Sequence, residues 1–213
     1  MQVGSPIEGV PDLPLPKTLL SAAKSISDKY SIDSARTRGA QLAAQKAGNP
    51  VKKMDAELYG AILLYTGNSI YREINRCLRS DWAKVRKYWP YLRLYLESMG
   101  CMPQRVGTLW RGISVDLYDD YKPGKIVTWW SISSCTADKS VAQGFMNQMG
   151  GGKASLITLH AKTACDISQL SFYPHEAESL LLPGTRLRVI SRQRNGPVAE
   201  LEVEEVGPDE EEE

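Results

Sequence analysis

The spacing of apolar residues divides the chain into a helical first part and a strand-rich second part. Between residues 54 and 99 apolar side chains recur every three or four positions, which is the period of an amphipathic helix. The pattern predicts one helix that starts at Met54 and ends at Gly67, a second that opens at Asn68, and a third over about residues 81–99. Pro90 is expected to bend or break the third helix, because proline lacks the N–H that a helix interior needs.

After Gly107 the period changes to that of short strands separated by Gly, Pro and Asp. One helical stretch interrupts them, from Asp138 to about Met149, and the glycine triplet at 150–152 is expected to form a flexible turn. This order predicts an α+β fold, with a helical N-terminal part packed on a strand-rich core of two sheets. The expected strands are Thr108–Ile113, Ile126–Ile132, Ala154–His160, Ser179–Leu182, Thr185–Ile190 and Val198–Val206.

The first 50 residues differ from the rest in composition. Residues 1–16 carry four prolines and are expected to be an extended leader. Residues 17–30 and 33–47 are rich in Ala and Ser, and we expect two peripheral or partly mobile helices there. The predicted organisation is a leader with peripheral helices over 1–50, one domain over 51–207 and an acidic tail over 208–213.

The charge of the chain is unevenly distributed. The 213 residues carry a formal net charge of +1, but nine acids and no base follow residue 199, which leaves residues 1–199 with 26 bases against 16 acids. A basic surface can bind nucleic acid, yet the densest basic run has helical spacing and no recognised nucleic-acid motif accompanies it, so we expect no nucleic-acid partner. No apolar run approaches the 18–20 or so residues that cross a bilayer, and we expect no membrane partner. That basic run comprises Arg72, Arg76, Arg79, Lys84, Arg86, Lys87 and Arg93.

The four cysteines are at least 24 residues apart, which gives no ligand spacing for zinc, and we expect no metal site. We favour the interpretation that all four thiols are free and that the protein works in a reducing compartment, the cytoplasm. The alternative, two disulfides in a secreted domain, requires an export signal, and residues 1–6 lack the basic-then-apolar pattern of one. Neither composition nor spacing predicts an oligomeric state. The cysteines are Cys77, Cys101, Cys135 and Cys165.

The first candidate site is Trp110-Arg111-Gly112, at the end of an expected strand. A guanidinium presents paired donors to phosphate, and glycine allows a ligand to approach the backbone. The alternative is a surface arginine that precedes a turn.

The second candidate is the serine-rich segment from Trp129 to Thr136. Strand alternation would put Ser131 and Ser133 on one face and Ser134 on the other. Such hydroxyls can bind a polar ligand or hold a catalytic carboxylate; alternatively they cap the following helix.

The third candidate is the pair Glu176 and Glu178, directly before an apolar strand. On extended backbone, carboxylates two residues apart point to the same side, and their like charges compete unless they have different roles. The alternative is a solvated pair.

In chain order, an Arg-Gly strand end, a serine-rich strand end and Glu-x-Glu resemble the catalytic signature of the arginine-specific mono-ADP-ribosyltransferases, which use an Arg-Ser-Glu triad. The resemblance covers about Met54–Val206 and excludes residues 1–50 and the acidic tail. It implies that the predicted domain binds NAD as a co-substrate and that the partners are proteins with exposed arginine. Further similar segments are Leu64–Gly67, Ile70–Asn75, Tyr91–Leu94, Thr128–Trp130 and Leu181–Thr185.

The resemblance also implies roles for individual residues at the NAD site. Arg111 would anchor the phosphates of NAD. The main chain of Gly112 would form hydrogen bonds with the nicotinamide amide, and Phe145 would pack near nicotinamide. The family's Ser-Thr-Ser motif falls on residues 134–136, where Cys135 and Thr136 replace the usual Thr and Ser. The triad serine is therefore either Ser134, which we favour, or Ser133.

The same resemblance assigns the two carboxylates to different steps. Glu178 would hydrogen-bond the ribose and stabilise an oxocarbenium-like state, held by the triad serine. Glu176 would bind the acceptor guanidinium and take its proton, and Tyr173 would contact the acceptor protein. A histidine in place of Arg111 is typical of the polymer-forming relatives, so arginine there favours transfer of a single ADP-ribose. Two alternatives remain open: an NAD glycohydrolase, and a non-catalytic NAD-binding module.

Overall fold

The computed structural model describes residues 4–45, 54–148 and 152–212. It divides into two compact units. The helical unit comprises Met1–Pro103 and Gln169–Pro174, and the sheet unit comprises Gln104–Ser168 and His175–Glu213. The predicted domain boundary at residues 50 and 51 lies outside the described residues, as does most of the glycine triplet predicted to be a flexible turn.

The helical unit contains the helices that apolar periodicity predicts between residues 54 and 99. The predicted third helix is two elements, because a 3-10 helix precedes α5 and Pro90 lies in the first turn of α5, where its missing N–H has no partner to lose. Capping side chains start three helices: Thr18 for α1, Asp28 for α2 and Asp55 for α3. The elements are η1 Val10–Asp12, α1 Leu19–Ala23, α2 Lys29–Ala44, α3 Ala56–Thr66, α4 Tyr71–Ser80, η2 Trp82–Tyr88 and α5 Trp89–Cys101.

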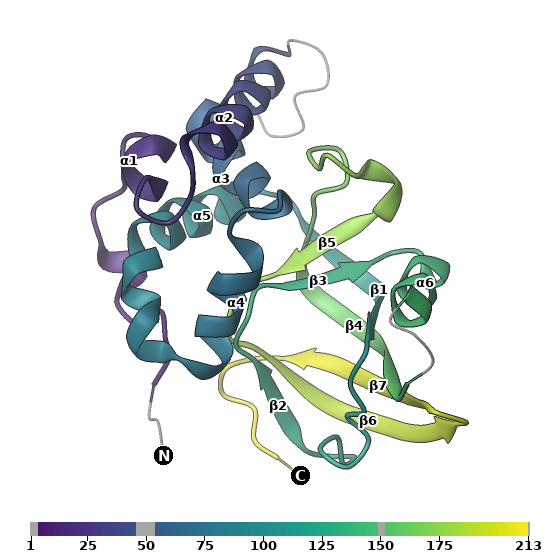
Figure 1. Ribbon diagram of the computed structural model, residues 1–213. Helices are drawn as coiled ribbons and strands as arrows, with labels where there is room; N and C mark the ends of the chain where they lie inside the picture. Colours follow the sequence, from purple (N-terminus) through teal and green to yellow (C-terminus); the bar gives the residue numbers. More distant parts are fainter. Residues whose placement is uncertain (1–3, 46–53, 149–151, 213) are drawn as a thin grey trace. The chain divides into compact units, whose positions relative to one another are not determined.

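The packing of α2 differs from the expected peripheral or mobile helix. A β-carbon placed on Gly39 of α2 would lie 2.5 Å from the carbonyl oxygen of Ala56, and one on Gly60 of α3 would lie 3.0 Å from the side chain of Leu19. The two glycines therefore allow the helix backbones to approach closely (Figure 1). A helix with few large apolar residues is consequently part of the core of its unit.

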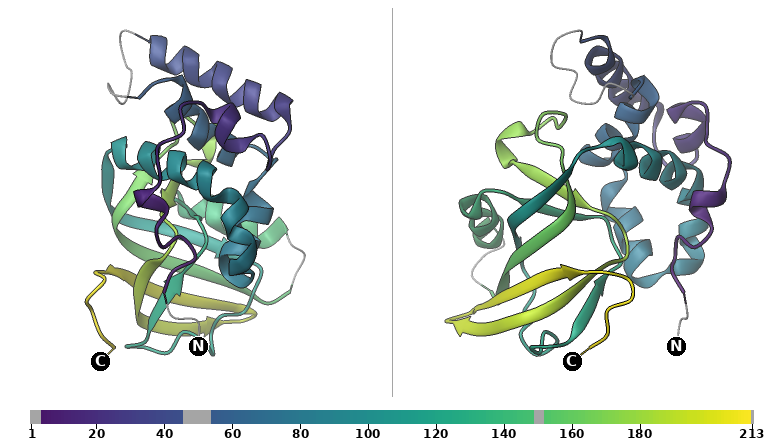
Figure 2. Two further views of the ribbon diagram at one scale, coloured as in Figure 1. Left: turned by 90° about the vertical axis from the view of Figure 1, so that its left-hand side faces the viewer. Right: turned by 180° about the vertical axis from the view of Figure 1, so that it is seen from behind.

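The sheet unit has seven strands in the hydrogen-bonded order β1-β3-β5-β4-β7-β6-β2. The α+β class is confirmed, but the expected two sheets are one, because the long strand β4 pairs antiparallel with β1, parallel with β7 and, at its end, with β5. In both views of Figure 2, β6 and β7 run side by side as a long ribbon. The elements are β1 Gln104–Ile113, β2 Ile126–Trp129, β3 Ser133–Thr136, α6 Lys139–Gln148, β4 Ala154–Asp166, β5 Glu178–Leu181, β6 Thr185–Asn195 and β7 Val198–Val206.

The serine-rich segment is not one continuous strand, so the predicted alternation over residues 129–136 is wrong. β2 ends at Trp129 and pairs with β6, whereas β3 starts at Ser133 and pairs with β1 and β5. The bend between them changes the partner strands. Ser133 and Ser134 thereby enter the middle of the sheet between β1 and β5.

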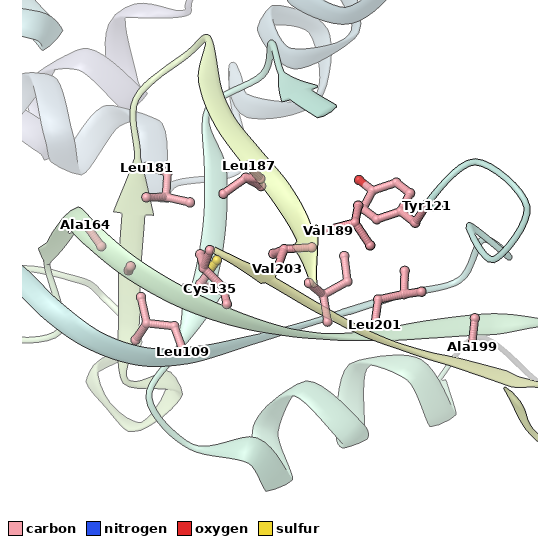
Figure 3. Close-up of a cluster of buried hydrophobic side chains, with 13 residues drawn as sticks. Leu109, Tyr121, Cys135, Ala164, Leu181, Leu187, Val189, Ala199, Leu201 and Val203 are labelled. Atoms are coloured by element: carbon pink, nitrogen blue, oxygen red, sulfur yellow. The ribbon is translucent and has the colours of Figure 1, made fainter. Parts of the chain in front are cut away.

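A cluster of buried apolar side chains fills one face of the sheet (Figure 3). Leu109 of β1 and Leu181 of β5 lie near Cys135, whose side chain points into the cluster from β3. The cysteine where the family pattern has threonine is therefore a core residue. Its neighbours Ser134 and Thr136 point to the opposite face of β3.

The acidic tail is anchored to β6 and β2. Arg186 donates three hydrogen bonds of 2.7–2.8 Å to carbonyl oxygens of Gly207, Pro208 and Glu210. The carboxylate of Glu212 accepts from the backbone N–H of Ile126 at 3.1 Å, on edge strand β2. The tail thus covers part of a strand edge that has no further strand beside it.

Candidate active site

Ser134 and Glu178 form the centre of the candidate site. The β3–β5 register pairs Thr136 with Glu178 and Ser134 with Leu180, so Ser134 and Glu178 lie diagonally on the same face of the sheet. The Ser134 hydroxyl donates to a carboxylate oxygen of Glu178 at 2.5 Å. The sheet pairing, rather than a flexible loop, therefore fixes this contact.

The environment of Glu178 raises the pKa of its carboxyl group. Burial is the main cause, since it disfavours the charged form, and the nearby Glu176 charge adds to it. The hydrogen bond from Ser134 acts in the opposite direction, because it stabilises the carboxylate. A partly desolvated carboxylate with one fixed donor is suited to stabilising a positive charge that develops beside it.

Glu176 lies on a tight turn rather than on extended backbone, which corrects the expected geometry of the pair. It ends the 3-10 helix η3, Pro174–Glu176, and the next residue, Ala177, has a left-handed backbone with φ +47°. The backbone between the two glutamates is therefore not the extended strand that would align their side chains. The charge of Glu176 still acts on Glu178, so the two remain electrostatically coupled.

Arg111 lies on β1, next to β3 in the sheet. One guanidinium nitrogen donates to the Ser134 carbonyl oxygen at 3.4 Å, and the guanidinium lies over the Trp129 indole, 5.3 Å from the ring centroid. The Trp129 Nε1 donates in turn to the hydroxyl of the buried Tyr121 at 2.8 Å. Arg111 thus contacts β3 through a hydrogen bond and Trp129 through its ring. Trp129 and Tyr121, which bond each other, are called the aromatic pair below.

Gly112 is needed for the approach of α6 to β1. A β-carbon there would lie 2.1 Å from the Ala142 carbonyl oxygen and 2.8 Å from the Met146 side chain. The residue therefore has a steric reason to be glycine, besides the proposed contact with a ligand. On the same helix, Phe145 is exposed to solvent, so its ring is accessible.

The Ser133 hydroxyl does not bond Glu178 but turns back to its own strand. The buried Ser133 hydroxyl donates to the Ser131 carbonyl oxygen at 3.3 Å, which leaves Ser134 as the serine that bonds the carboxylate. Tyr173 belongs to the helical unit, where its ring is partly exposed and its N–H donates to the Ser171 hydroxyl at 3.0 Å.

Sequence reasoning missed three residues of this site. Trp129 lay in a segment similar to the family but had no assigned role, and Tyr121 carried no signal. Thr136 was noticed as a departure from the family motif and as a helix cap, but its contact with Glu176 was not expected. Because all three act through partners distant in sequence, local pattern could not reveal them.

The sequence model of a family described as NAD:arginine ADP-ribosyltransferase matches residues 18–209. The chain belongs to this family. The chain is 28% identical over 138 residues to Ecto-ADP-ribosyltransferase 5 of Bos taurus, covering 58% of this chain and 42% of the relative. It is 29% identical over 150 residues to NAD(+)–protein-arginine ADP-ribosyltransferase Tre1 of Pseudomonas putida (strain GB-1), covering 69% and 28%. The chain therefore spans less than half the length of these relatives.

The fold agrees with solved ADP-ribosyltransferase structures. The structure of Vis from Vibrio splendidus, solved with agmatine, superposes with a TM-score of 0.65 at 19% identity, covering 94% of this chain and 91% of that one. At this identity the likeness establishes the fold. Within residues 4–45, 54–148 and 152–212, no helix combines the length and apolar character of a membrane span. Those same ranges hold no group of three or more His, Cys, Asp or Glu side chains placed to bind a metal ion.

Proposed function

We propose that this protein transfers a single ADP-ribose from NAD to arginine side chains of acceptor proteins and releases nicotinamide. The observation that carries the proposal is the Ser134–Glu178 hydrogen bond, with Glu176 two residues away on a fixed turn. Family membership and the name of the Pseudomonas putida relative support NAD as co-substrate and arginine as acceptor.

In the first step, the bond between the ribose C1′ and the nicotinamide nitrogen breaks, and its electron pair leaves with nicotinamide. The ribose then carries an oxocarbenium-like positive charge. The Glu178 carboxylate stabilises this charge through the ribose, and the hydrogen bond from Ser134 keeps the carboxylate in place. Arg111 supplies fixed positive charge for the NAD phosphates, while Gly112 and Phe145 contribute to the nicotinamide side of the site.

In the second step, a guanidinium nitrogen of the acceptor forms a bond to C1′ and loses a proton. A protonated guanidinium is a poor nucleophile, so the acceptor needs a base. Glu176 is the group we assign to this step: its carboxylate binds the cation and takes the proton. Tyr173, three residues earlier in the chain, is assigned to contact with the acceptor protein.

The test is protein labelling from NAD that carries a label in its adenylate part. The wild-type chain is expected to label arginine-rich proteins, and Glu178→Gln, which keeps the size of the side chain and one acceptor oxygen but removes its charge, is expected to abolish labelling. Peptide mass spectrometry of the labelled protein identifies whether arginine is the modified residue. Labelling that persists in Glu178→Gln refutes the proposal. Nicotinamide release without any labelled protein indicates a glycohydrolase, and NAD binding without turnover indicates a binding module.

A further inference from the structure

Thr136 connects the end of β3 to the turn that carries Glu176. It is almost fully buried, with 4% of its surface exposed. Its hydroxyl donates to the Glu176 carbonyl oxygen at 2.9 Å and accepts from the backbone N–H of Asp138 at 3.0 Å. The next residue, Ala137, donates its N–H to the Ala177 carbonyl oxygen at 3.2 Å. Two consecutive residues thus hold two consecutive carbonyls of the turn.

This support matters because the turn has an unfavourable backbone conformation. Among the described residues other than glycine, Ala177 alone has a positive φ, at +47°. L-residues with a β-carbon rarely adopt that region. Such a conformation persists where its surroundings fix it, and the bonds from Thr136 and Ala137 flank it directly.

The β3–β5 register places Thr136 opposite Glu178, but Glu178 has anchors that do not involve the Thr136 hydroxyl. Its carboxylate accepts from Ser134 at 2.5 Å, and its carbonyl oxygen accepts from the N–H of Ile167 at 3.0 Å. Removal of the Thr136 hydroxyl would therefore release the backbone of Glu176 while leaving the Glu178 carboxylate held. The two carboxylates can be disturbed separately.

We propose that Thr136 is a positioning residue for Glu176 and thereby sets how the ribosyl group is divided between arginine and water. The inference rests on the proposed function, in which Glu176 takes a proton from the acceptor guanidinium as its nitrogen bonds C1′. Hydrolysis uses water in place of that nitrogen and needs Glu178 but not a correctly directed Glu176. A misdirected Glu176 therefore slows transfer more than NAD cleavage.

The experiment compares Thr136→Val, Thr136→Ser and wild type with NAD and agmatine, whose guanidinium matches that of arginine. ADP-ribosyl-agmatine and nicotinamide are both quantified, and NAD hydrolysis is also measured without agmatine. Thr136→Val is expected to lower kcat/KM for agmatine by about 10- to 100-fold, the scale on which small misplacements of a catalytic group act. Hydrolysis and the KM for NAD stay near wild type, and Thr136→Ser, which keeps the hydroxyl, restores transfer.

Ser140→Ala is the matched control for the start of α6. The Ser140 hydroxyl donates to the Asp138 carboxylate at 2.6 Å, so this variant disturbs the same helix start without touching the Glu176 turn. It is expected to leave the ratio of transfer to hydrolysis unchanged. Should Thr136→Val fail to fold, Thr136→Ala carries the same expectation, because it removes the hydroxyl without placing a methyl group against the Glu176 carbonyl.

Three results would overturn the inference. Equal transfer by Thr136→Val and wild type shows that the hydroxyl does not position Glu176, and an equal loss of transfer and hydrolysis shows that Thr136 supports the whole site. In both cases wild-type transfer leaves the proposed function intact. Wild-type protein that forms no ADP-ribosyl-agmatine refutes the proposed function and this inference with it.

Discussion

The Arg111 guanidinium lies over the indole ring of Trp129, 5.3 Å from its centroid. The indole is fixed from its other side, because its Nε1 donates to the Tyr121 hydroxyl at 2.8 Å. A cation held over an aromatic face is attracted to it by about 0.5–2 kcal/mol, more when it is desolvated. The aromatic pair therefore restricts the positions that Arg111 can take before NAD binds.

Tyr121→Phe is expected to weaken NAD binding several-fold while changing kcat little. The substitution removes the acceptor for the partly buried Trp129 indole N–H, and a fully buried donor without a partner costs about 1–3 kcal/mol, which is the upper limit here. Calorimetric titration with NAD, alongside KM and kcat, measures the effect. Tyr118→Phe is the matched control, since the Tyr118 ring lies beside Arg192 and Arg194 rather than Trp129. Unchanged NAD affinity in Tyr121→Phe would show that the pair does not orient Arg111.

NAD cleavage should be lost below a certain pH, which is called the acid limit here. Two substitutions should shift this acid limit in opposite directions. In the proposed reaction cleavage needs ionised Glu178, so we expect activity to fall as the pH drops through the pKa of that group, which burial raises above the ordinary glutamate value. Ser134→Ala removes the bond that lowers this pKa and moves the limit to higher pH. Glu176→Gln removes a charge that raises it and moves the limit to lower pH.

The measurement is kcat/KM for NAD against pH, followed through nicotinamide release so that loss of transfer does not interfere. Shifts of the same sign in both variants would contradict the assignment of Glu178 as the titrating group.

The fold class and the main carboxylate pair were predictable because both depend on local pattern. Apolar periodicity separated helices from strands, and Glu176 and Glu178 are close in sequence. The break between β2 and β3 was not predictable, because residues 130–132 alternate as a strand would. Only the different partner strands, β6 for β2 and β1 with β5 for β3, separate the two elements.

The packing of α2 was missed for a different reason. Its contact with α3 depends on the absence of side chains at Gly39 and Gly60, which lowers the apolar content that sequence analysis measures. Likewise, the Arg111–Trp129–Tyr121 contacts join residues from a strand end, a second strand and a loop. Such contacts follow from tertiary structure and leave no periodic signal.

Gly112→Ala is expected to destabilise the sheet unit. The added β-carbon would lie 2.1 Å from the Ala142 carbonyl oxygen, so α6 must move away from β1. Overpacking of this kind costs about 1–3 kcal/mol, which denaturant unfolding measures directly. Gly144→Ala is the control. Gly144 lies on α6, the helix that packs on Gly112, and a β-carbon there meets no atom within 4 Å. It should stabilise the helix by about 0.5–1 kcal/mol, and equal effects of the two changes would contradict the packing argument.

Cys135 is expected to resist thiol reagents in the native protein. Burial raises the pKa of its thiol to about 12, so almost no thiolate forms at pH 8. Burial likewise raises the pKa of Cys165 to about 11, whereas the partly exposed Cys101 is accessible. Iodoacetamide labelling followed by peptide mass spectrometry should find Cys101 modified first, and all four cysteines modified in urea. Early native labelling of Cys135 would show that the β1–β3–β5 core opens readily.

In the proposed reaction the chain directs ADP-ribose to a guanidinium, and Glu176 is the group that does so. The most direct test incubates labelled NAD with agmatine and compares wild type with Glu176→Gln. We expect wild type to form ADP-ribosyl-agmatine, and Glu176→Gln to lose this product while still releasing nicotinamide. Transfer by Glu176→Gln at the wild-type rate, or nicotinamide release by wild type with no ADP-ribosyl-agmatine, would contradict it.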